Sequence, residues 1–109
     1  METDYREEVL ASLQALLNGV PDVKQGKAFG KPAFKNGRKV FCFVGGEGIA
    51  IKLPEAKVAE LVAANDEMKI FEPMEGTQWK GWVEIDRSNA DDYSNDMSLL
   101  QESIKYVVA

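Results

Sequence analysis

The side chains most able to do chemistry in this chain are basic residues gathered in one stretch, between residues 24 and 44. Six of the thirteen basic residues and no acidic residue lie there: Lys24, Lys27, Lys31, Lys35, Arg38 and Lys39. Since the 109-residue chain has a net charge of −5, the remainder carries −11. Cations interleaved with aromatic side chains, here Phe29 and Phe34, can contact the phosphates of a nucleic acid. The stretch therefore predicts a nucleic-acid-binding surface made of Lys27, Lys31, Lys35, Arg38 and Lys39.

The affinity of this surface for nucleic acid is limited by the geometry of a strand. Because successive side chains of a strand point to opposite faces, only about half of the six cations share a face. About three phosphate contacts then follow, with a shallow salt dependence of slope near −3 and weak binding at cellular salt. A second interpretation stays open, in which the lysines form a solvated edge that prevents aggregation.

A different surface is indicated by the tryptophans. Between residues 78 and 85, the apolar positions alternate with Lys80, Trp82 and Glu84, so Trp82 falls on the polar face of the expected strand. An exposed tryptophan more often marks a partner contact than a catalytic pocket. The alternative prediction is therefore a module that binds a protein or a small ligand through Trp82, Phe71 and the cleft between the last helix and the sheet.

Catalytic and metal-binding signals are weak. The chain has no histidine, and its single cysteine, Cys42, lies in an apolar run where burial would raise the thiol pKa. Asp91, Asp92 and Asp96 are acidic neighbours that could attract Mg²⁺, but the start of a helix accounts for at least two of them. We expect a protein that is not an enzyme, without a cofactor or a metal.

The basic stretch is expected to form a β-hairpin. Ala33–Lys35 and Lys39–Val44 flank Asn36-Gly37, the dipeptide best suited to a type I′ turn. In the second arm, alternation places Val40, Cys42 and Val44 on one face and Phe41 and Phe43 on the other, as in an interior strand covered on both sides. A strand over 49–53 continues this arrangement into a three-stranded antiparallel meander.

Helices and further strands are expected around this meander. The first helix runs from about Asp4 to Asn18, with a capping box between Asp4 and Glu7. A second helix follows Pro54 and stops near Asn65, and a last helix begins near Ser88 or Asn89. The other expected strands are Val23–Gly30 at an edge, Ile70–Phe71 halted by Pro73, and Gln78–Ile85.

These elements predict a single domain over residues 1–109. Its class is α+β: an antiparallel sheet with projecting hairpins, covered by N-terminal, middle and C-terminal helices. The longest apolar run, Val40–Val44, is far too short for a membrane span. The acidic N-terminus lacks the pattern of a signal peptide, so we expect a cytoplasmic protein and no membrane partner.

Four segments also resemble a known family. The chain is similar to the MmcQ/YjbR-like family and, more distantly, to the TfoX N-terminal domain in four segments placed between the expected helices: KAFGKPAFKNGRKVF, GIAIKLP, FEP and WKGWVEI. The resemblance runs from Val20 onward and is most specific at Gly30–Phe34, Lys39–Phe41 and Lys52-Leu53-Pro54. It implies a compact α+β domain with two hairpin wings and a DNA-binding role, and no known reaction, cofactor or metal.

Overall fold

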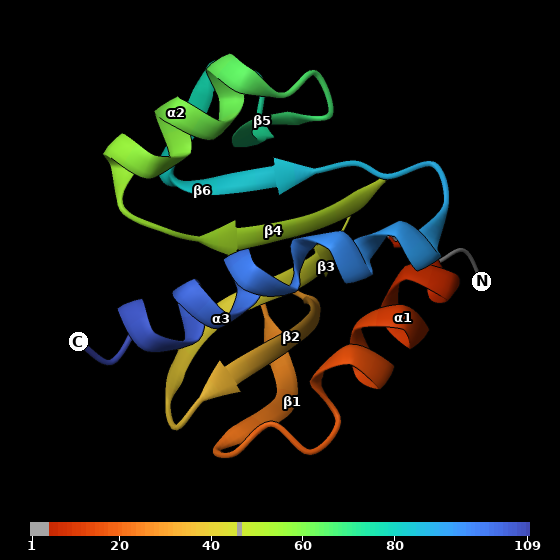
Figure 1. The fold of residues 1–109 in the computed structure, drawn as a ribbon. Helices are drawn as coiled ribbons and strands as arrows, with labels where there is room; N and C mark the ends of the chain where they lie inside the picture. Colours follow the sequence, from red (N-terminus) through yellow and green to blue (C-terminus); the bar gives the residue numbers. More distant parts are fainter. Residues whose placement is uncertain (1–4, 46) are drawn as a thin grey trace.

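The fold is an open antiparallel sheet with its helices on one face (Figure 1), as seen in a computed structural model that describes residues 5–45 and 47–109. The elements in chain order are α1 (Glu7–Leu17), β1 (Val23–Ala28), β2 (Lys31–Asn36), β3 (Lys39–Gly45), β4 (Gly48–Lys52), α2 (Glu55–Ala64), β5 (Met68–Met74), β6 (Thr77–Ile85), the 3-10 helix η1 (Ala90–Asp96) and α3 (Met97–Tyr106). The predicted α+β class and order of elements are confirmed.

Helix α1 begins later than expected. Its N-cap is Arg6, whereas the predicted cap, Asp4, lies outside the described residues. The Arg6 guanidinium donates hydrogen bonds to the main-chain oxygens of Glu47, Arg87 and Ser88, at 3.1, 2.7 and 3.0 Å. The start of the helix is thereby tied to two loops that are distant in sequence.

The sheet has the strand order β1-β2-β3-β4-β6-β5, so the predicted meander is confirmed and extended by β1. The turn between β2 and β3 differs from the prediction. Asn36 pairs with Lys39, which leaves Gly37 and Arg38 as the central residues, and only Gly37 has a positive φ, of 63°. This pattern of φ signs is that of a type II′ turn, so the predicted type I′ turn at Asn36-Gly37 is wrong.

Strand β3 contains an irregularity that changes which way Phe41 points. Phe34 pairs with Cys42 and Lys35 with Val40, so Phe41 has no partner in β2 and forms a bulge. As a result Phe41 lies in the same helix-covered core as Cys42 and Val44. The predicted strict alternation, with Phe41 and Phe43 on one face, is wrong because one extra residue reverses the alternation.

Two other boundaries differ from the predictions for physical reasons. Strand β5 runs through Pro73 to Met74 instead of stopping before the proline. Because β5 is an edge strand, with β6 as its only neighbour, a missing N–H can be tolerated there. The last helical segment starts as η1, with the Asn89 side chain accepting a hydrogen bond from the Asp91 N–H, and becomes α3 at Met97.

The main core lies between the helices and one face of the sheet (Figure 1). Helix α1 contributes Val9, Leu13 and Leu17, which are buried together at a spacing of four residues. Val58 of α2, Tyr93 of η1 and Leu100 of α3 join the same cluster. Among the described residues, no helix has the length and apolar character that crossing a membrane requires. The expected cytoplasmic location stays a prediction.

Candidate functional site

The face of the sheet opposite the helices, here called the open face, is covered by no helix in the part of the chain that the structure describes. It has a second, smaller apolar cluster made entirely of strand residues. Ala33, Phe43, Ala50 and Trp82 are buried in it, and Ala28, Val40, Phe71 and Trp79 pack against it. Strand side chains with no layer above them are normally exposed, so another feature must exclude water from this face.

That feature is an aromatic cluster, defined as Phe29, Phe43, Phe71, Trp79 and Trp82, whose neighbouring ring centroids lie 5.0 to 6.1 Å apart. Phe29 follows β1, and Trp79 is in β6. The 5.0 Å between the Phe29 and Trp79 rings shows that side chains from the β1–β2 turn and from β6 meet over the open face.

Phe29 is held in an unusual conformation. Ala28 pairs with Lys31, so Phe29 and Gly30 are the central residues of a two-residue turn, and both have positive φ, 57° and 74°. Such a turn suits glycine or asparagine, whereas a bulky residue there stores strain of order 1 kcal/mol. Phe29 keeps this conformation although its side chain is 56% exposed. Strain combined with exposure of an aromatic ring is typical of a functional position.

Three lysines of the basic stretch share the open face. Lys24 stands directly opposite Lys35 in the β1–β2 pair, and Lys31 and Lys35 are on the same side of β2 as buried Ala33. Two like charges directly opposite each other are destabilising. This arrangement concentrates positive charge at one edge of the aromatic cluster.

Small residues leave room for the lysine stems. A Cβ atom added at Gly26 would stand 3.2 Å from Cε of Lys35, and one added at Gly45 would overlap the stem of Lys31. Both lysines therefore lie along the open face. Lys52 of β4 joins them from the other side of Phe43, with its Nζ 5.2 Å from the centre of the Trp82 ring, a cation–π distance.

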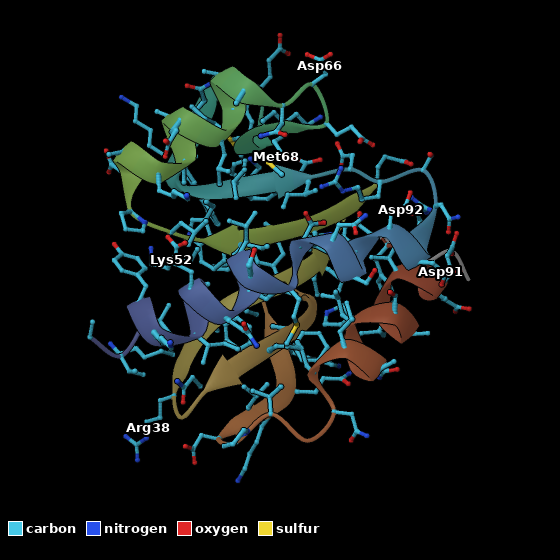
Figure 2. All side chains as sticks on the ribbon, in the orientation of Figure 1. Arg38, Lys52, Asp66, Met68, Asp91 and Asp92 are labelled. Carbon is cyan, nitrogen blue, oxygen red and sulfur yellow. The ribbon has the colours of Figure 1, made fainter. Side chains whose placement is uncertain are left out.

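The residues predicted for the nucleic-acid surface do not share one face. Lys31 and Lys35 lie on the open face, but Lys27 is on the side of β1 that faces the helices, and Lys39 is opposite Asn36, whose side chain bonds α3. Arg38 projects from the tip of the β2–β3 turn (Figure 2). The structure thus brings Lys31 and Lys35 together with Lys24 and Lys52, which the sequence did not place in the set.

The open-face lysines of β1, β2 and β4 have no acidic partner among the described residues. Among the described residues, ion pairs involve the basic side chains of Arg6, Lys57, Lys69 and Arg87, and none involves a basic residue between 24 and 39 or Lys52. A cation without an internal counter-charge can pair with an external anion without first breaking a contact. These lysines, Lys24, Lys31, Lys35 and Lys52, are called the lysine set below.

Trp82 is not where the sequence predicts it. Its side chain is only 8% exposed, so the prediction of a solvent-facing tryptophan is wrong. The cause is the packing of Phe29 and Phe43 against its ring. Trp82 and half-buried Phe71 also lie on the open face, whereas α3 covers the other face, so they do not border a cleft between α3 and the sheet. A protein- or ligand-binding role for the pair stays a prediction.

Acidic side chains lie at the opposite edge of the open face. Glu84 is next to Asp86, and Lys69 Nζ is 3.6 Å from Glu84 and 3.5 Å from Asp86. Burial, followed by the neighbouring Asp86, raises the pKa of Glu84 to about 7. Glu72 and Glu75 occupy the exposed end of the β5–β6 hairpin, where Glu72 accepts a hydrogen bond from the Gly76 N–H. The positive and negative edges of the face are therefore distinct.

The remaining reactive groups have structural roles. Cys42 is fully buried, and burial raises the pKa of its thiol far above the usual range. Asp96, one of the three acidic neighbours considered for Mg²⁺, is buried and forms a two-pronged ion pair with Arg87. No cluster of three or more potential metal ligands occurs within residues 5–45 and 47–109.

Comparisons with known proteins leave the chain without a match: no family model, no curated protein and no solved structure resembles it detectably. The resemblance to the MmcQ/YjbR-like family stays a prediction.

Several residues of the site were missed by sequence reasoning. Lys52 and Phe43 join Lys35 only through the β2–β3–β4 pairing, which no local spacing reveals. The turn at Phe29-Gly30 had a weak signal, because Gly30 stands between two strand-like stretches. Phenylalanine is so unusual at the first position of that turn that composition alone predicts an extended segment there.

Proposed function

We propose that this chain is a nucleic-acid-binding domain without catalytic activity, which holds phosphates with the lysine set. The observation that carries the proposal is the placement of lysines without acidic partners around an aromatic surface that none of the helices covers, within residues 5–45 and 47–109. Phosphates bind where lysines lack internal partners, and aromatic rings offer contacts to bases. The proposal keeps Lys31 and Lys35 from the predicted surface and replaces Lys27, Arg38 and Lys39 by Lys24 and Lys52.

The number of lysines determines the expected salt dependence. Four phosphate contacts give a slope of log affinity against log salt of about −3 for a single strand and about −3.6 for a duplex. Affinity should fall about 50- to 150-fold between about 50 and 200 mM salt. The excess negative charge of the chain opposes binding, but screening limits its reach to about 8 Å at physiological salt.

The test is fluorescence anisotropy of labelled oligonucleotides at low salt, with charge-reversed variants. Lys31→Glu combined with Lys35→Glu should abolish binding. A matched control with the same change in net charge is Lys57→Glu combined with Lys105→Glu, both on helices. This control should weaken binding only slightly. Equal losses for the two double variants, or no binding by the unaltered chain at low salt, would refute the proposal.

A further inference from the structure

Resting on the proposed function, we infer that the ligand is a single strand of nucleic acid whose bases stack on Phe29 and Trp79 at the mouth of the open face. The shared chemistry of the ligand is an unpaired base attached to a phosphate, in DNA or RNA. Phe29, the most exposed member of the aromatic cluster, has its ring 5.0 Å from Trp79, which is half-buried. Together they present adjoining ring surfaces to solvent.

The rings of the aromatic cluster pack against one another. Phe29 contacts Phe43, Trp79 and Trp82 edge-on or nearly so, with interplanar angles between 61° and 90°. Its ring is therefore braced from below, and the strained turn at Phe29-Gly30 is maintained by these contacts. A braced, exposed ring loses little conformational freedom when a base stacks on it, so stacking is favoured.

The chemistry of the bases favours a single strand over a duplex. In a duplex the base faces are stacked on one another, and an aromatic side chain reaches them only after unstacking. In a single strand the faces are free, and each stacked base contributes an amount that depends little on sequence. The aromatic cluster therefore favours a strand with free base faces.

The distribution of charge leads to the same choice. The lysine set lies on β1, β2 and β4, whereas Glu72 and Glu75 lie at the end of the β5–β6 hairpin. A duplex gripped by both hairpins would place a second row of phosphates beside these carboxylates. A single strand brings one row of phosphates, which the lysine set can follow while its bases reach Phe29 and Trp79.

The experiment compares three probes of about ten nucleotides, a length within the range of single-strand sites: oligothymidylate, oligouridylate and a matched DNA duplex. Both single strands should bind more tightly than the duplex and quench tryptophan fluorescence. Phe29→Leu keeps the apolar bulk but not the aromatic face, and should weaken single-strand binding about 5- to 150-fold, equivalent to one stacked base. Phe29→Tyr, which keeps an aromatic face, should bind single strands as the unaltered chain does. Whether DNA or RNA binds more tightly identifies the source of the strand.

The control is Met74→Ala, which removes an exposed apolar side chain from the other hairpin and should leave binding unchanged. The salt slope should be the same for Phe29→Leu and the unaltered chain, since no phosphate contact is lost. If the lysine variants abolish binding but the duplex binds as well as the single strands and Phe29→Leu binds normally, the inference is overturned and the proposed function survives. If no probe binds at low salt, both fail.

Discussion

Ser103 connects helix α3 to the main chain of the sheet, and its removal provides a sharp test of the fold. The fully buried Ser103 hydroxyl lies within hydrogen-bond distance of the main-chain oxygens of Phe41 in β3 and Lys52 in β4. One side chain of α3 therefore ties the helix to both strands.

The loss of stability expected for Ser103→Ala follows from the hydrogen bonds to these two carbonyl oxygens. A hydroxyl has one proton, which the two acceptors share, and an unsatisfied buried acceptor costs about 1 to 3 kcal/mol. We expect the free energy of unfolding to fall by about 2 kcal/mol, and the melting temperature to fall by roughly 10 °C for a domain of this size. Urea denaturation and thermal melting followed by circular dichroism measure both quantities.

Ser98→Ala is the matched control, because Ser98 is exposed on the same helix. It should change the free energy of unfolding by no more than about 0.5 kcal/mol, with a small gain from the helix propensity of alanine. If Ser103→Ala is as stable as Ser98→Ala, the hydroxyl does not stabilise the packing of α3 on the two strands, and the reasoning is wrong.

Two further predictions concern ionised side chains. The pKa of Glu84 is about 7 in the folded chain and lower, near its ordinary value, in the unfolded chain. At a pH between these two values folding takes up a proton, so the free energy of unfolding should fall as the pH rises through 7. Measured by urea denaturation, the decrease in this free energy between pH 5.5 and pH 8 should be smaller for Glu84→Gln than for the unaltered chain, and equal decreases would contradict the raised pKa of Glu84. Asp96→Asn should reduce the free energy of unfolding by about 2 kcal/mol, because it removes the buried carboxylate from Arg87, which keeps only its ion pair with exposed Glu67. Asp92→Asn, at an exposed site on η1 (Figure 2), should have little effect, and similar losses for the two variants would refute a special role for Asp96.

Local signals in the sequence predicted most of the elements. The leucines of α1 recur at helical spacing, Pro54 and Asn65 bound α2, and glycines mark the hairpins, so the α+β class followed from residues close together in the chain. Errors occurred where an edge or a bulge relaxed a local rule. Pro73 did not stop β5, because an edge strand has one side without hydrogen-bond partners.

The sequence by itself determined the periodicity of each helix and strand and the excess of positive charge between residues 24 and 44, because both depend on neighbouring residues. Only the tertiary structure decided which side chains meet. One bulge at Phe41 changed which residues face the core, pairing across β2, β3 and β4 placed Lys52 on the same face as Lys35, and the packing of Phe29 against Trp82 buried the tryptophan. Strand pairing and ring packing join residues up to about fifty positions apart, and no spacing within a single strand encodes them.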